Sequence, residues 1–387
     1  MRDIEDIDQI LLPYTARSSS NSLSTPLILD VEICKGQRVY SKEQIKRNLD
    51  FLLTAVEPNH EALLRVNTGL TNIGELNQRI LYLTQIANNH SIIVEASPDR
   101  LILLLSLEES CFLNPRTYPS LKYYLQAGEE SKFLADLSNV LEIVGAISGL
   151  TMALTLGLSA PFPDFTLFFT QLRNLHGRLR FVTLSLERNP IAVSDALRLA
   201  QPLPPSDPFA LVMAIERGSK GDVTRADILP VSILHPFETL LKALGFPHYA
   251  LRPAPTCGWW FALVSTPESH TSVPVTKFYD MWGLHHALKP LSTRLHKAGK
   301  LNLLSGMQLR RAVRKCVLPH VDIPDTLKLL RDSKSKADVD YTVDHTQFWF
   351  IHNTMDMASL DLRRRAQCTF LSEGLDGKMA ASCTGCV

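Results

Sequence analysis

Residues 26–56 read PLILDVEICKGQRVYSKEQIKRNLDFLLTAV and contain one complete strand-then-helix unit. The apolar, β-branched run Pro26–Ile33 predicts a strand. Ser41 and Gln44 match the S-x-x-Q capping box that opens a helix. The residues that follow carry an apolar stripe at helical spacing: Ile45, Leu49, Leu52, Leu53 and Val56. A strand followed directly by an amphipathic helix is the repeating unit of a parallel sheet, so this stretch predicts an α/β fold.

The same unit recurs as far as residue 186. Asn72, with Glu75 three residues later, opens a second helix in the same way. Later helices are expected at Ser131–Val144 and Asp164–Leu175. Further strands are expected at Ala62–Val66, Ser91–Ala96, Leu101–Leu107, Ser148–Leu158 and Arg180–Leu186. Together with Pro26–Ile33 these make six strands, which fits a partial (β/α)6 barrel open on one side better than a closed eight-stranded barrel.

The chain divides into three regions of different character. Residues 1–25 are acidic at first and then Ser-rich, which is typical of a flexible N-terminal arm. Residues 26–245 carry the alternating strands and helices and end in a helix that Asp207 caps after a Pro-rich stretch. Residues 246–387 contain all four tryptophans. We therefore expect a compact C-terminal α+β domain there.

Composition indicates a globular chain and excludes several classes of partner. The 387 residues are 45% apolar and 20% charged, with a net charge of +1. So small a charge gives no field that would attract nucleic acid or an anionic membrane. The one long uncharged run, Ile143–Pro163, is interrupted by Gly and Pro, which favours a helix end, a strand and a loop over a membrane span. The start lacks the features of a secretion signal, so a cytoplasmic location is expected.

Cysteines supply the strongest chemical signal. Cys257, Cys368 and the closing C-x2-C pair, Cys383 and Cys386, provide four thiols in the C-terminal region. Thiolates are the ligands of iron–sulfur clusters and of tetrahedral zinc, so a shared 4Fe-4S cluster is one interpretation and zinc is another. The alternative is two buried thiols and a frayed terminal pair. Cys111 and Cys316 lie in apolar surroundings and are expected to be core residues.

Other short catalytic motifs are absent. The chain contains no G-x-G-x-x-G, no G-x-x-x-x-G-K-[ST], no H-E-x-x-H and no G-x-S-x-G. These absences leave the cysteines as the main candidates for chemistry.

An ordered set of motifs resembles the radical S-adenosylmethionine (SAM) superfamily, in the branch that contains tetraether synthase. The tail has an aromatic run at 348–350, a His and Met segment at 352–357, Asp361 with Arg364 and Cys368, and Asp376-Gly377 followed by Cys383. Upstream segments also match: residues 205–216, 220–223 and 227–231, then Pro255–Val264 (PTCGWWFALV) and Pro274–Asp280 (PVTKFYD). The resemblance covers about residues 27 to 387. It implies a radical-SAM-like barrel followed by a C-terminal domain with an auxiliary iron–sulfur cluster.

The chain departs from this family at its first strand. Members carry C-x3-C-x2-C there, and the three thiolates hold the cluster that binds and cleaves SAM. Here Cys34 is the single cysteine in the segment directly after that strand, Cys34–Tyr40, and is interpreted as a relic cofactor ligand. The family's Gly-Gly-Glu-Pro is replaced by Val66–Thr71 (VNTGLT). Both losses remove the usual ligands of SAM.

Three functional hypotheses follow. The favoured one is a non-catalytic partner or substrate-binding subunit of a biosynthetic radical SAM system, which binds a complete homologue, a peptide or a small-molecule substrate. The second is an active SAM-dependent or redox enzyme with an unusual cluster site, and the third is a metal-free α/β binding protein. Whether the chain is an enzyme stays open. In an active homologue, Glu32, Glu95 and Glu108 would lie on strands near substrate groups.

Overall fold

The computed structural model describes residues 28–56, 62–186, 208–237, 257–265, 272–298, 303–319, 345–353, 370–373 and 379–381, apart from residues 36, 70–71, 148–149, 176 and 235. A mostly parallel sheet of twelve strands forms its centre. The expected α/β class is therefore confirmed.

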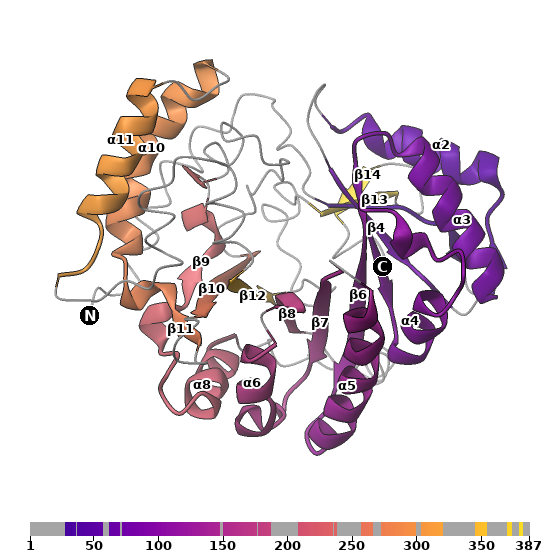
Figure 1. Ribbon diagram of the computed structural model, residues 1–387, viewed down its shortest axis with the longest axis horizontal. Helices are drawn as coiled ribbons and strands as arrows, with labels where there is room; N and C mark the ends of the chain where they lie inside the picture. The colour runs from indigo at the N-terminus through magenta and orange to yellow at the C-terminus, as the bar shows by residue number, and fades with distance from the viewer. Residues whose placement is uncertain are drawn as a thin grey trace, which may run out of the picture.

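Six parallel strands in chain order form the middle of this sheet (Figure 1). Each of these six strands pairs with the next one of the six, because a helix returns the chain to the end of the sheet where the previous strand began. The strands are β1 (Ile28–Asp30), β4 (Leu63–Asn67), β5 (Ser91–Ala96), β6 (Thr117–Leu125), β7 (Met152–Leu158) and β8 (Leu179–Leu186).

Helices pack on one side of these six strands, on the outside of the curved row of strands in Figure 1. Alternate strand residues such as Leu29, Leu64 and Ile92 join helix residues in one hydrophobic core. The helices are α2 (Lys42–Leu53), α3 (Ile73–Ile86), α4 (Pro98–Leu105), α5 (Glu130–Ala146), α6 (Phe165–Arg173) and α8 (Pro208–Gly218), with a 3₁₀ turn, η1, at Cys111–Leu113. We call the opposite side of these six strands the inner face.

Strands from the C-terminal region extend the sheet at both edges. β12 (Thr346–Asn353) lies parallel to β8, and β10 (Gly258–Ser265) is antiparallel to β12. β11 (Ser272–Pro274) pairs with β10, as does β9 (Leu229–Pro230), which lies before the C-terminal region in the chain. At the other edge, β13 (Phe370–Glu373) lies parallel to β1 and pairs with β14 (Met379–Ala381). The C-terminal region therefore shares one sheet with the N-terminal strands.

A second hydrophobic core lies around β10. It joins Trp260 and Val264 to helix α10 (Met281–Ala298), helix α11 (Leu303–Lys315) and the 3₁₀ turn η3 (Val231–Leu234). The expected boundary at residue 245, like the arm at residues 1–25, lies outside the described residues.

Local helix signals are confirmed. Ser41 and Gln44 form the expected capping box at α2, with Gln44 N donating to Ser41 Oγ at 3.3 Å. Asn72 caps α3 by accepting from Glu75 N at 3.1 Å. The run Ile143–Pro163 holds the end of α5 and strand β7, and no described helix is both long and apolar enough to cross a membrane.

The strand expected at Leu101–Leu107 is wrong, because these residues belong to helix α4 and the turn after it. Ser97 occupies the N-cap position and Pro98 the first turn, which together start a helix. The apolar run was short enough to fit either structure. The true fourth strand is β6, where Pro119 and several polar side chains obscure the pattern of a central strand.

Candidate functional site

Register across the sheet places polar side chains side by side on the inner face. Asp30 lies opposite Arg65 on β4. Nearer the carboxyl ends of the strands, Lys122, Thr155 and Thr183 form one row. The next row contains Tyr124, Gly157, Ser185 and His352. Carboxyl ends of parallel strands are where α/β proteins commonly bind ligands, so this face is the candidate site.

Four alternating charges cross β1, β4, β5 and β6 on this face. Arg65 donates from Nε and Nη2 to both carboxylate oxygens of Asp30, at 2.5 and 2.8 Å. Its Nη1 lies 4.0 Å from Oε2 of Glu95, whose Oε1 lies 3.0 Å from Nζ of Lys122. The Glu95 side chain is only 3% exposed, whereas that of Lys122 is 40% exposed. We call these four side chains, Asp30, Arg65, Glu95 and Lys122, the charge chain. Its Glu95 carboxylate is buried, and its last member, the Lys122 ammonium, is accessible.

Glu95 interacts with Lys122 through charge. Lys122 is close enough to Oε1 for an ion pair, yet no hydrogen-bond donor in the described part of the chain is well aligned with that oxygen. We treat the contact as electrostatic attraction that holds the ammonium in place. Glu95 was expected among the site residues. Glu108, expected on a strand, instead lies in the exposed turn after α4.

Cys34 lies just beyond β1, in the short hairpin of β2 (Cys34–Lys35) and β3 (Arg38–Val39). Its thiol donates to the carbonyl oxygen of Asn67 at 3.6 Å, so it contacts the carboxyl end of β4. Nearby, Tyr40 Oη donates to Glu32 Oε2 at 3.1 Å. Burial, and then the charge of Glu32, raises the pKa of Tyr40. Cys34 thus lies close after β1, at the carboxyl ends of the parallel strands, as the sequence predicts.

The other predicted metal ligands are only partly described. Cys257 is buried directly before β10, at the carboxyl edge of the parallel strands, and its neighbour Gly258 pairs with His352. Cys368, Cys383 and Cys386 lie outside the described residues. Their nearest described neighbours, Phe370 and Ala381, belong to β13 and β14, at the other end of the sheet order from β10. No group of three metal-ligating side chains occurs within the described ranges.

Two of the quoted motif segments have a structural role. Asp227, 3% exposed, accepts from the backbone and hydroxyl of Thr224, both at 2.8 Å, and from Thr276 Oγ1. Lys277 Nζ lies 3.1 Å from the same carboxylate. The segment at 227–231 and the segment at 274–280 are therefore joined through one buried carboxylate beside the second core.

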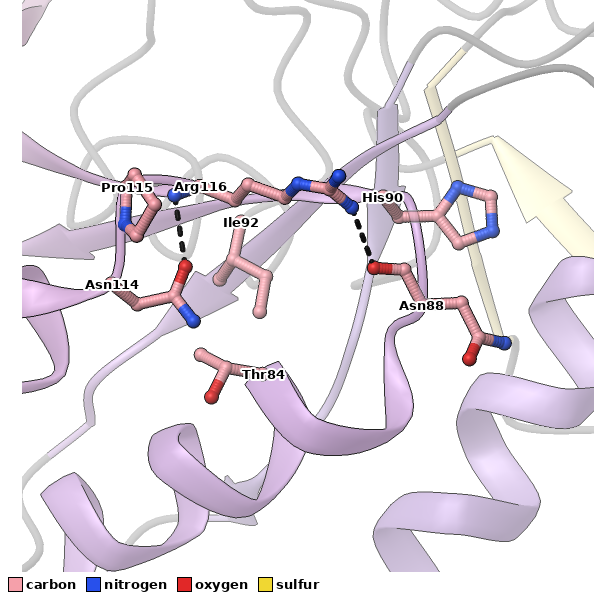
Figure 2. Close-up of a pocket in the computed structure, with 7 residues that line it drawn as sticks. All are labelled: Thr84, Asn88, His90, Ile92, Asn114, Pro115 and Arg116. Carbon is pink, nitrogen blue, oxygen red and sulfur yellow. Dashed lines mark hydrogen bonds between the residues drawn. The ribbon is translucent and has the colours of Figure 1, made fainter.

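A separate pocket, shown in Figure 2, lies at the amino ends of β5 and β6. Its volume is about 250 Å³. His90 Nδ1 accepts from Ala62 N at 3.0 Å, and burial lowers the pKa of His90, so the imidazole is a neutral acceptor. Arg116 donates to the carbonyl of Asn88 at 2.8 Å. These polar groups hold loops together, and we do not assign the pocket a function.

Comparisons with known proteins leave the family open. A scan against protein-family models finds no matching family, and a search of curated proteins finds no significant match.

Sequence reasoning missed Arg65, Lys122, Thr155 and Thr183. A usable signal was present: in LLRVN and SIIVEA a charged residue occupies the strand face that alternates with the apolar positions. These side chains could not be grouped from sequence, because their proximity depends on the register of four strands.

Proposed function

We propose that this chain is a radical-SAM-like binding protein that holds a polar small molecule on its inner face and does not cleave SAM. In this role it serves as the substrate-binding or partner subunit of a complete radical SAM enzyme. The observation that carries the proposal is the polar character of the inner face. Central strands packed on both sides would carry apolar residues at these positions. Here they carry two ion pairs and a set of hydroxyl groups.

The SAM-cleaving cluster does not fit the residues after β1. Such a cluster needs three thiolates, and Cys34 is the single cysteine in residues 28–56. Its thiol is hydrogen-bonded to Asn67, and its neighbours form a tight hairpin in place of a cluster loop. We therefore assign no reaction step to this position.

A metal centre at the C-terminal cysteines is part of the proposal. Cys257, Cys368, Cys383 and Cys386 would hold a 4Fe-4S cluster, or zinc, as thiolates. Such a centre would supply electron transfer if it is a cluster and local structural stabilisation if it is zinc. Cys111 and Cys316 do not suit this role, because each thiol packs among apolar side chains in a hydrophobic core.

The decisive experiment measures 5′-deoxyadenosine, the product of SAM cleavage. The full chain, purified without oxygen, is incubated with SAM and a strong low-potential reductant. We expect no product above the level of a reaction without protein, while an intact radical SAM enzyme in parallel should give clear turnover. Sustained product formation that tracks protein concentration would show that the chain is an active enzyme and would overturn the proposal.

A further inference from the structure

The inner face contains two hydroxyl donors that no other described residue uses, in one row with the ammonium of Lys122. Lys122, Thr155 and Thr183 are direct neighbours on β6, β7 and β8. Adjacent strands are about 4.8 Å apart, so these three side chains span about 10 Å. Thr155 and Thr183 are half-buried, and neither hydroxyl has a hydrogen-bond partner among the described residues. An ammonium and two free hydroxyls in one row can all donate to the same ligand.

The next row toward the carboxyl ends brings two more hydroxyl groups to the same face, those of Tyr124 and Ser185. Gly157 lies between Tyr124 and Ser185 and places no side chain on the face. Residues two apart on a parallel strand are separated by about 6.6 Å, so this row lies directly beyond Thr155. The Ser185 hydroxyl, like those of the two threonines, has no hydrogen-bond partner in the described part of the chain.

Glu95 holds Lys122 in position, and the ammonium keeps N–H donors for a ligand. Its contact with Glu95 at 3.0 Å fixes the ammonium on the inner face. The ammonium has three N–H donors and its side chain is 40% exposed, so donors remain for a ligand. Glu95 in turn lies beside Arg65, which reduces its unbalanced negative charge. The exposed end of the charge chain is therefore positive.

An aromatic surface adjoins the donors. Phe181 precedes Thr183 by two residues, lies on the same face and is 44% exposed. It stacks on Phe348 of β12, with ring centroids 5.6 Å apart and an interplanar angle of 18°. An aromatic pair with one exposed ring, Phe181, beside hydrogen-bond donors fits a ligand with one apolar part and one charged part.

We infer that Lys122, Thr155 and Thr183 form the binding site for the oxyanion of a small molecule, a carboxylate or a phosphate, whose apolar part lies against Phe181 and Phe348. This inference names the ligand class of the proposed binding function and therefore rests on it. Charge-assisted hydrogen bonds from the ammonium to the oxyanion supply the specificity.

The test measures the affinity of the full chain for three probes of similar shape by calorimetry. Benzoate represents the carboxylate source, phenyl phosphate the phosphate source, and benzyl alcohol an uncharged control. We expect one anion or both to bind at least tenfold more tightly than benzyl alcohol, and the tighter anion identifies the source. Equal affinity for all three probes, or no binding of either anion, would overturn the inference.

Three variants locate the site. Lys122→Gln should weaken anion binding at least tenfold, whereas Lys132→Gln, which removes one exposed positive charge from α5, should leave it unchanged. Lys122→Gln also removes the nearer of the two cations beside Glu95. The double variant Thr155→Val/Thr183→Val therefore provides an independent test, because it keeps the ion pair between Lys122 and Glu95. It should weaken binding at least threefold. Unchanged affinity in the double variant, or equal effects at Lys122 and Lys132, would contradict the assignment.

The two proposals fail separately. Formation of 5′-deoxyadenosine would overturn the non-catalytic role without bearing on anion binding. Failure of both anions to bind would overturn the ligand class and leave the absence of SAM cleavage untouched.

Discussion

At the scale of single residues, Asp227 shows how a buried charge is stabilised. Burial alone would raise its pKa, but hydrogen bonds from Thr276 and Thr224 and the contact with Lys277 outweigh burial and lower it from the ordinary value of 3.8. A carboxylate whose pKa is lower in the folded state stabilises the fold above the ordinary pKa. That contribution is lost as the pH falls through the folded-state value.

Asp227→Asn should therefore lower the free energy of unfolding by about 2–3 kcal/mol at pH 7. The difference from wild type should shrink as the pH falls from the ordinary pKa of 3.8 through the lower folded-state pKa, because the carboxylate takes up its proton over that range. Denaturant unfolding at several pH values measures both quantities. Asp50→Asn, which breaks the exposed pair with Lys46, is the control and should leave the free energy of unfolding nearly unchanged, because solvent screens an exposed pair. A difference at Asp227 that does not vary with pH would contradict the argument.

At the scale of elements, the contact between β10 and β12 depends on a glycine. A Cβ at Gly258 would lie 2.2 Å from the carbonyl oxygen of Ile351, which is backbone and cannot rotate away. Gly258→Ala should force the strands apart and cost about 3 kcal/mol. A Cβ added at Gly177 would have no atom within 4 Å, so Gly177→Ala should change the free energy of unfolding by less than about 0.5 kcal/mol. Thermal unfolding compares the two, and equal stability would show that β10 and β12 adjust without strain.

At the scale of the whole molecule, the C-terminal region contacts both edges of the central strands. β12 pairs with β8, while β13 pairs with β1. Cys257 precedes β10 at the first edge, and the described neighbours of Cys368 and Cys383 belong to β13 and β14 at the second. A metal that binds all four thiols would therefore couple metal content to the stability of the C-terminal region.

Cys257→Ser and Cys368→Ser should each remove the bound metal and lower the melting temperature. Iron, sulfide and zinc analysis of oxygen-free preparations measures the metal, and iron without matching sulfide would argue against a cluster. Cys111→Ala is the control. It should keep the metal and cost only a packing term of about 1 kcal/mol, because that thiol belongs to the main core. Full metal content in both serine variants would refute the shared site.

The sequence determined the features that depend on neighbouring residues. The caps at Ser41 and Asn72 were readable because a capping bond closes within three residues. The α/β class was also correct, and five of the six expected strands coincide with β1, β4, β5, β7 and β8. One strand was misplaced, because a short apolar run at Leu101–Leu107 fits a helix as well as a strand.

Tertiary structure decided everything that depends on pairing between distant segments. Strand register brings Asp30, Arg65, Glu95 and Lys122 together although they are far apart in the chain. The edge positions of β12 and β13 likewise follow from long-range pairing. Local propensity carries no information about which strand lies beside which, because the hydrogen bonds of a sheet join residues at any separation along the chain. The sequence therefore determined the class and its local signals, and the tertiary structure decided which side chains form the site.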